Sequence, residues 1–367
     1  MDAINDEDCV KSIRAFVRSQ PDIEINTFIQ RGLNGYIYFG KRKKLGDDVV
    51  LKFYWSDSPQ YDASEEAVVL QKIDHDNILK IYDLRFIEPN YAYFLTPRIS
   101  EIDLQQTIDS QAISTKMALN ITEGLLLGLT ELHSKHNLVH RDLKPANILI
   151  NSNNQPIIAD FGAVKRIDDV QRYVTASKAT YYYLPPESIQ RDEYYFQSDI
   201  YQVGVILFQM LGGYFPLSDE MAWMTKREVK TLSGIRNSDR KSELFLEYIG
   251  NKINKGVLAD TSTLPFYLDP YYKRVLNIAL NVNYLKRYAN PAFFLKDIHK
   301  LLRSTPNYIK EGPNDILIVH DNGRQYRISK NNRQNWVLEK RTEGKDWRKD
   351  NTHNGKIESI LTIARKS

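Results

Sequence analysis

The chain has 367 residues, of which 42% are hydrophobic and 26% charged, and its 50 basic side chains outnumber the 46 acidic ones by four. This composition excludes a chain that is disordered throughout, and the length allows one large domain with a small appendage. The single cysteine, Cys9, excludes an intrachain disulfide and is compatible with a reducing compartment.

We expect neither a secretory signal nor a membrane span. Acidic residues at Asp2, Asp6 and Glu7 stand where a secretory signal needs basic residues ahead of an apolar core. The apolar stretch from Val203 to Leu211 is far shorter than the roughly 20 residues that span a bilayer. The sequence therefore predicts a soluble, cytoplasmic protein that has no membrane partner.

The first predicted element is a short amphipathic helix over residues 6–19. Ile13, Phe16 and Val17 recur at helical spacing, and acidic residues stand at the start, where they favour a helix. A strand-like stretch from Ile23 to Gln30 follows, and it leads into a turn that contains Gly32 and Gly35.

Glycines are needed where backbone amides approach a phosphate without a side chain in the way. An ordinary glycine hairpin is the alternative, and the lysine in the next strand decides between the two. Val49-Val50-Leu51-Lys52-Phe53 is an apolar strand with one cation, and a buried ammonium needs an anion beside it. For Lys52 alone, a solvated lysine on an edge strand would be the default interpretation.

The next predicted helix supplies a carboxylate for Lys52. Glu66, Val69, Leu70 and Ile73 follow the i, i+3, i+4, i+7 series, so Glu66 lies on the inward side of that helix. Two strands follow, and a long helix is then predicted from Ser114 to His136 as a support for the segment that comes after it.

That segment reads His140-Arg141-Asp142-Leu143-Lys144-Pro145-Ala146-Asn147, and Asp160-Phe161-Gly162 follows it after a short apolar strand. Phosphoryl transfer needs a carboxylate to accept the proton of the attacking hydroxyl, and oxygen ligands for magnesium. Asp142 fits the first role, Asn147 and Asp160 fit the second, and Lys144 neutralises the phosphoryl group. A His-Arg-Asp triplet alone is common by chance, but the order and context of the whole string are not.

Two further motifs follow the same order, Pro185-Pro186-Glu187 and Ser198-Asp199-Ile200-Tyr201-Gln202-Val203-Gly204. The complete series, over about residues 25–303, resembles the eukaryotic-type protein kinase family, and specifically its serine/threonine kinases. The resemblance implies an α+β, two-lobed fold with a small β-rich N-lobe at about 25–98 and a large helical C-lobe at about 103–303. Residues 1–24 then form an N-terminal helix, and residues 308–367 form a basic, β-rich extension.

The resemblance also implies ATP and Mg²⁺ as cofactors. Gln30 stands where the phosphate-covering pattern of the family has its first glycine. Because of this departure from the pattern, we expect an altered nucleotide affinity. Thr96 stands at the gatekeeper position, and Asp103 stands near the ribose, although packing roles for the hinge residues and a helix cap at Asp103 remain alternatives. The implied nucleotide-binding residues are Ile29, Gly32, Gly35, Ile37, Lys52, Thr96, Pro97, Ile99, Asp103 and Leu149.

Substrate type and control follow from the same resemblance. Lys144 and Thr180 are typical of serine/threonine kinases, with Thr180 bridging Asp142 and Lys144. Tyr181, Tyr182 and Tyr183 are expected to shape the substrate groove as packing residues. Arg141 and Lys165 would hold a phosphate on Thr175 or Ser177, because a guanidinium there needs an anion. The alternative is that Arg141 bonds only to backbone.

Three buried charged residues are expected to be structural. Glu187 should pair with Arg287, since buried charges need partners. Asp199 should hold the backbone of the loop from His140 to Asn147, here called the catalytic loop. The segment between Leu217 and Pro270 is predicted to be a solvated extension of the large lobe.

The last 60 residues carry 13 basic against 8 acidic side chains. Residues 316–319, a turn at Asp321-Asn322-Gly323 and the alternation of Tyr326 and Ile328 predict a β-hairpin, to which Trp336 adds a strand. The basic residues could suit nucleic acid or an acidic protein, but the surplus is small, and a β-appendage docked on the large domain is favoured over nucleic-acid binding. A partner at this extension stays an open alternative, and nucleic acid is not expected.

The sequence thus predicts transfer of the γ-phosphoryl group of Mg-ATP to Ser or Thr hydroxyls of proteins, including the chain's own activation segment. One alternative is a nucleotide-binding scaffold that lacks turnover, but Lys52, Glu66, Asp142, Asn147 and Asp160 are all present. The other is a small-molecule phosphotransferase, and such enzymes lack the platform built on Pro185-Pro186-Glu187.

Overall fold

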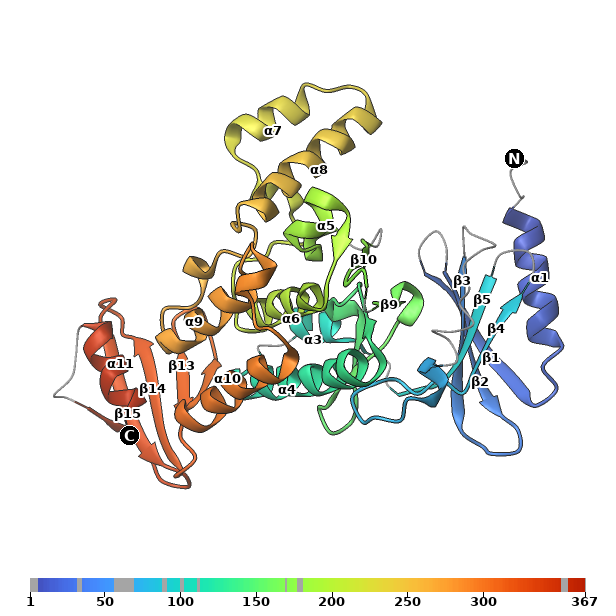
Figure 1. Ribbon diagram of the computed structural model, residues 1–367. Coiled ribbons are helices and arrows are strands. Elements are labelled where there is room, and N and C mark those ends of the chain that lie inside the picture. Colours follow the sequence, from blue (N-terminus) through green and yellow to red (C-terminus); the bar gives the residue numbers. More distant parts are fainter. Residues whose placement is uncertain are drawn as a thin grey trace.

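A computed structural model of the chain describes residues 6–31, 35–55, 69–87, 91–99, 102–110, 113–168, 170–176, 181–350 and 356–366. Figure 1 shows a β-sheet at each end of the molecule, the N-terminal sheet beside α1 and the C-terminal sheet beside α11, with a helical body between them. The predicted α+β, two-lobed architecture is confirmed. Among the described residues, no helix is both long and apolar enough to cross a bilayer.

The small lobe is one antiparallel sheet with the strand order β1-β2-β3-β5-β4. Because side chains alternate along a strand, Leu51 and Phe53 of β3 point to the face that α1 covers, and Lys52 points to the other face. Ile13 of α1 is fully buried, and the Phe16 ring lies 4.9 Å from that of Tyr93. The strands and helix are α1 (Asp6–Arg18), β1 (Ile23–Arg31), β2 (Gly35–Arg42), β3 (Asp48–Trp55), β4 (Asp83–Ile87) and β5 (Tyr91–Pro97).

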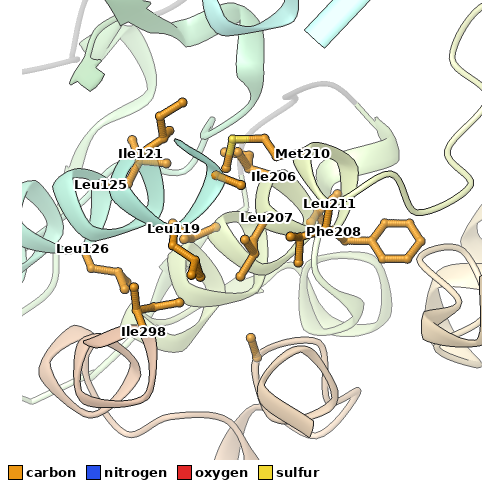
Figure 2. Packing of buried hydrophobic residues seen from close by; sticks show 14 of the residues in the cluster. Leu119, Ile121, Leu125, Leu126, Ile206, Leu207, Phe208, Met210, Leu211 and Ile298 are labelled. Atoms are coloured by element: carbon orange, nitrogen blue, oxygen red, sulfur yellow. The ribbon is translucent and has the colours of Figure 1, made fainter. Parts of the chain in front are cut away.

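The large lobe is built around α4 and α6. Figure 2 shows leucine and isoleucine side chains of these two helices meeting, with Ile298 of α10 beside Leu126 of α4. The α-helices of this lobe are α3 (Leu104–Ser110), α4 (Thr115–Thr130), α5 (Pro186–Arg191), α6 (Phe196–Met210), α7 (Lys226–Ser233), α8 (Ser238–Asn254), α9 (Pro270–Ala279) and α10 (Pro291–Ser304).

The long helix predicted from Ser114 to His136 is present in two parts. The Ser114 hydroxyl accepts a hydrogen bond from the amide of Met117 and caps α4, and the helix then continues through a π-helical turn, η1 (Glu131–Lys135). Two glycines on one side of α4, Gly124 and Gly128, allow the strand β8 (Pro156–Ile158) to approach closely. A Cβ atom at Gly124 would lie 2.5 Å from the Pro156 ring, so no larger residue fits there.

Short strands and turns carry the connections that surround the site. The strand pairs are β6 (Leu138–Val139) with β9 (Lys165–Arg166), β7 (Ile148–Ile150) with β8 (Pro156–Ile158), and β10 (Val174–Thr175) with β11 (Glu193–Tyr194). The 3₁₀ turns are η2 (Pro145–Asn147), η3 (Phe161–Ala163), η4 (Tyr181–Tyr183), η5 (Glu220–Trp223), η6 (Thr261–Thr263) and η7 (Tyr284–Lys286).

The C-terminal extension is a five-stranded antiparallel meander with one helix. Its hairpin and its third strand were predicted, whereas α11 was not. Tyr308 and Ile318 belong to the same hydrophobic core as Tyr272 of α9, and Arg365 of α11 donates to the carbonyl of Leu268 at 2.8 Å. The elements are β12 (Asn307–Lys310), β13 (Ile316–Val319), β14 (Arg324–Lys330), β15 (Trp336–Thr342), β16 (Arg348–Lys349) and α11 (Ile357–Arg365).

Candidate active site

The two lobes meet at an ion pair between Lys52 and Asp160. Lys52 Nζ lies 2.6 Å from Asp160 Oδ2, although 108 residues separate them in the chain. Both side chains are 26% exposed, so the pair is partly open to a ligand. Lys52 extends from β3 on the face of the sheet opposite α1. Asp160 follows β8 in the left-handed region, with φ of 65° and ψ of 72°. A non-glycine residue adopts this backbone only where its surroundings fix it, which is common at functional sites.

Asp142 is the centre of a second group of polar side chains. Lys144 Nζ lies 2.9 Å from Asp142 Oδ2, and Asn147 Nδ2 donates both to this oxygen at 2.9 Å and to the Asp142 carbonyl at 2.7 Å. These bonds occupy the amide nitrogen of Asn147, which leaves Oδ1 as the atom that suits a cation. The turn η2 brings the three residues together, and Pro145 at its start fixes the local backbone.

A buried carboxylate holds this loop in place. Asp199, on the first turn of α6, accepts hydrogen bonds from the backbone amides of His140 at 2.9 Å and Arg141 at 3.0 Å. Its oxygens also accept from His133 Nε2 at 2.7 Å and from the Tyr194 hydroxyl at 2.6 Å. Burial alone would raise the pKa of Asp199, but these donors, His133 foremost, hold it below its ordinary value. The predicted role of Asp199 as the anchor of the loop is confirmed.

The sequence analysis missed a second anchor one turn along α6. The fully buried Gln202 accepts hydrogen bonds at Oε1 from the Leu143 amide at 2.9 Å and the Tyr194 hydroxyl at 2.9 Å. Its Nε2 donates to the carbonyl of Tyr183 at 3.3 Å. Gln202 therefore ties the catalytic loop to the segment after residue 180. The sequence did carry a sign of this role, because Gln202 is a polar side chain in an otherwise apolar stretch. A buried amide side chain is stable only when it is hydrogen-bonded.

His140 supports the same loop from its other side. Its Nε2 donates to the Ala159 carbonyl at 3.1 Å, and its Nδ1 accepts from the Asp142 amide at 3.4 Å, which requires the neutral ring. Burial lowers the pKa of His140, and the nearby carboxylates offset this only in part. The ring thus links the loop that carries Asp142 to the strand that delivers Asp160.

The predicted pair of Glu187 and Arg287 is confirmed. The guanidinium donates from Nη1 to Glu187 Oε1 at 2.7 Å and from Nη2 to Oε2 at 2.8 Å, and both side chains are buried. Ser198 of α6 donates to the same Oε1, and the Arg287 guanidinium lies 4.8 Å from the Tyr201 ring centre. This pair fixes α5 against α6 beneath the segment that begins at Tyr181.

The predicted adenine-side residues of the small lobe lie on β1, β2 and β5 or directly after β5. Ile29 pairs with Ile37 in β1 and β2, and Ile37 pairs with Lys52 in β3, so the three share one row of the sheet. Thr96 is buried on β5, directly before Pro97, and Ile99 is half-buried after the strand ends.

Asp103 and Leu149 pair in an isolated bridge on the large-lobe side. Asp103 Oδ1 accepts from the Gln106 amide at 2.8 Å, and Gln106 Oε1 accepts from the Asp103 amide at 2.9 Å. This reciprocal capping box is the helix-cap alternative considered for Asp103, and it stabilises the start of α3.

Four predicted residues, Gly32, Glu66, Ser177 and Thr180, lie outside the described residues. Gly35 begins β2, directly after the first of these gaps. Among the regulatory residues, Lys165 pairs with Val139 between β9 and β6, and Thr175 lies opposite Glu193 between β10 and β11. Arg141, with a φ of 71°, donates from Nη1 to the Ala163 carbonyl at 3.1 Å, which is the backbone interaction considered as its alternative role.

The site fits a metal nucleotide better than a metal alone. Within the described part of the chain, no three His, Cys, Asp or Glu side chains are grouped as metal ligands. Asp160 and Asn147 supply hard oxygen atoms, and magnesium commonly binds one or two such protein ligands and takes the rest from substrate phosphates and water. The Lys52 ammonium group beside Asp160 is placed to bind a phosphate group that is itself bound to the metal.

Comparison with known proteins gives a consistent result. The family described as protein kinase domain matches residues 23–291. The chain is 31% identical over 202 residues to the probable serine/threonine-protein kinase PknB of Lactococcus lactis, a match that covers 53% of this chain and 32% of that protein. It is 33% identical over 175 residues to the mitogen-activated protein kinase mpkC of Emericella nidulans, over 47% of this chain and 41% of that protein.

A third relative is the serine/threonine-protein kinase TIO of Arabidopsis thaliana, 25% identical over 239 residues, which are 64% of this chain and 18% of that protein. The matches to these three relatives thus span less than half of each relative's length.

Proposed function

The chain belongs to the protein kinase family, and from this membership we propose that it transfers the γ-phosphoryl group of Mg-ATP to serine or threonine hydroxyls of proteins. The observation that carries the proposal is the ion pair of Lys52 and Asp160, 2.6 Å apart across the two lobes. A cation for phosphate and a ligand for magnesium lie next to each other there, and Asp142, the proposed base, lies on the loop that His140 links to the residue before Asp160.

Each residue of the site has a stated task in this reaction. Asp142 orients the hydroxyl of the substrate and accepts its proton, and Lys144, 2.9 Å from Asp142, stabilises negative charge on the transferred group. Lys52 binds and orients the phosphates. Asn147 and Asp160 would hold Mg²⁺, which when bound neutralises charge on the phosphate oxygens.

The surface formed by α5, α6 and the segment that begins at Tyr181 supports a protein as the acceptor of the phosphoryl group. The pair of Glu187 and Arg287 and the hydrogen bond from Gln202 to the Tyr183 carbonyl fix this segment on α5 and α6. A small molecule would not need a surface of this size, so the platform favours an extended polypeptide substrate. The serine/threonine kinases among the relatives support the choice of acceptor hydroxyl.

The proposal is tested by incubating the purified chain with Mg-ATP and a peptide library, and mapping phosphosites by mass spectrometry. We expect labelled Ser and Thr, and we expect Asp142→Asn to reduce turnover by roughly 10²- to 10⁴-fold, because it removes the proton acceptor. The matched control is Asp109→Asn, which changes an exposed aspartate of α3 and should leave turnover unchanged. If the Asp142→Asn variant labelled the peptides as strongly as the wild type, Asp142 would not be the proton acceptor.

We also propose control through the activation segment. A phosphate on Ser177 or Thr175 would add a strong acceptor group to the segment between β10 and η4. Thr175 lies opposite Glu193, whose carboxylate already binds Arg191 at 2.5 Å, so a phosphate on Thr175 would compete for that arginine. Substituting both Thr175 and Ser177 by Ala should lower turnover sharply, and the two single variants identify which hydroxyl matters. Unchanged turnover in the double variant would exclude this form of control.

A further inference from the structure

The segment that was predicted to be a solvated extension forms a helical hairpin of α7 and α8, here called the basic hairpin (residues 226–255). Lys252 of α8 binds Glu228 of α7 at 3.2 Å and joins the two helices. Figure 1 shows the hairpin standing out from the large lobe, beyond α5. One end of the hairpin packs on the lobe, and the other end is surrounded by solvent.

The first sixteen residues of the hairpin have a strong excess of positive charge. Between Lys226 and Lys241 there are six basic side chains and two acidic ones, a surplus of four within sixteen residues. One of the two carboxylates, Glu228, is already bound by Lys252. All six basic side chains are exposed: Lys226, Arg227, Lys230, Arg236, Arg240 and Lys241.

These cations are not required for the fold of the hairpin. Its anchor is a separate hydrophobic cluster in which Ile249 and Ile253 of α8 pack with Trp223 and Leu258. Among the described residues, Arg240 is the one member of the six that forms an ion pair, with Glu243 at 3.2 Å. Like charges that lie close together repel one another and oppose folding. These basic side chains therefore do not stabilise the hairpin, and a binding partner of opposite charge would explain their presence.

The hairpin is continuous with the predicted substrate groove. A Cβ atom at Gly250 of α8 would lie 2.8 Å from the Tyr181 hydroxyl, so α8 contacts η4 directly. Tyr182 stacks on Trp223 with ring centres 4.7 Å apart. A polypeptide that lies along η4 therefore has the basic hairpin beside it.

We propose that the basic hairpin is a docking surface for an Asp- and Glu-rich segment of the protein substrate, an inference that rests on the proposed kinase function. Charge complementarity is the reason for this choice of partner, because exposed cations on a protruding element attract an acidic segment and speed its encounter. Single-stranded nucleic acid fits less well. Residues 226–244 contain no aromatic side chain, and stacking on aromatic rings is a main source of affinity for bases.

The test uses two fluorescent peptides that share one acceptor serine and differ only in a flanking segment, which is Glu-rich in one and Gln-rich in the other. Affinities are measured by anisotropy on the Asp142→Asn protein, so binding is read without turnover. We expect the Glu-rich peptide to bind on the order of tenfold more tightly at low salt and to lose this advantage at high salt, as exposed ion pairs do.

A hairpin variant replaces Lys226, Arg227, Lys230 and Arg236 by Gln. Its matched control replaces four exposed basic residues of the C-terminal extension, Lys310, Arg324, Lys345 and Arg348, by Gln. We expect the hairpin variant alone to lose the preference for the Glu-rich peptide. In the otherwise wild-type chain, KM for that peptide should rise about tenfold, and kcat for the Gln-rich peptide should stay the same.

Two outcomes overturn the docking proposal. One is equal affinity of the hairpin variant and the unchanged protein for the Glu-rich peptide. The other is binding of a single-stranded RNA oligonucleotide that exceeds that of the Glu-rich peptide and is lost in the hairpin variant, which would assign the surface to nucleic acid. A chain that binds the Glu-rich peptide but phosphorylates neither peptide would disprove the kinase proposal and leave docking intact.

Discussion

At the scale of single residues, the site depends on a few buried polar side chains of α6 that set the position of the loop with Asp142 and Asn147. Asp142 and Asn147 contact each other. The backbone on either side of Asp142 is fixed by Asp199 and Gln202 of α6, which accept from the amides of His140, Arg141 and Leu143. Asp199 was predicted as an anchor from its motif. Gln202 lies in the same motif but was given no separate role, because only the folded chain shows which groups it binds.

We expect Gln202→Leu to lower kcat, because it leaves the Leu143 amide and the Tyr194 hydroxyl without this acceptor. Loss of a buried hydrogen-bond partner costs about 1–3 kcal/mol in the free energy of unfolding. The control is Gln209→Leu on the same helix, since Gln209 binds the Tyr183 hydroxyl at 2.9 Å and does not reach the catalytic loop. Steady-state kinetics and urea denaturation of both variants measure the two effects separately. An equal fall in kcat in both would contradict a positioning role specific to Gln202.

A second residue-scale prediction concerns His140 and pH. Burial lowers the pKa of its ring below 6.5, so the unfolded chain binds a proton at this residue more readily than the folded one does. The stability that His140 contributes is therefore complete above about pH 6.5 and is lost as the pH falls toward its depressed folded-state pKa. We expect Tm to fall on acidification from pH 7.5 to 5.5, and to fall less in His140→Gln. Scanning calorimetry of both proteins provides the test, and parallel pH profiles would argue against it.

At the scale of elements, the approach of α4 to the hairpin of β7 and β8 decides where the loop between Asp142 and Asp160 lies. Gly124 and Gly128 make this approach possible, and the sequence analysis treated the helix as a support without assigning them a role. Two glycines in a helix normally lower its stability, so their presence indicates a close neighbour.

We expect Gly128→Ala to destabilise the protein, even though alanine favours helix. The new Cβ atom would lie 2.9 Å from Ile158 Cδ1 and 3.1 Å from the Asn77 carbonyl, and overpacking of this kind costs typically about 1–3 kcal/mol. The matched control is Gly234→Ala at the end of α7, where the nearest heavy atom would be 3.5 Å away. Equal Tm values for Gly128→Ala and the wild type would show that β8 can move aside.

At the scale of the whole molecule, the C-terminal extension is part of the large lobe in its packing. Tyr308 is buried in the shared core, and its amide donates to the Thr115 hydroxyl at 2.9 Å at the start of α4. The sequence analysis favoured a docked appendage over a nucleic-acid surface. The continuous hydrophobic core agrees with docking and gives it a physical basis.

We therefore expect the extension and the large lobe to unfold together. Tyr308→Ala should cost about 3–5 kcal/mol, as large aromatic truncations in a core do. Hydrogen exchange should then show lost protection in α4 and α9 as well as in β13 and β14. The control is Tyr214→Ala, which removes an exposed tyrosine. Loss of protection limited to residues after 306 would mean that the extension is an independent unit.

The sequence by itself determined the family and the order of the motifs. It predicted the chemistry of Lys52, Asp142, Asn147 and Asp160, because these residue types occur together in the order and context of the family's motifs. It also predicted the elements with strong periodicity, among them α1, the helix from Ser114 and the C-terminal hairpin. Tertiary structure alone decided the partners of Gln202 and Tyr194, the presence of α11, the shared core of the extension and the protrusion of the basic hairpin. These features depend on contacts between distant segments, and local sequence patterns carry no record of which segments meet.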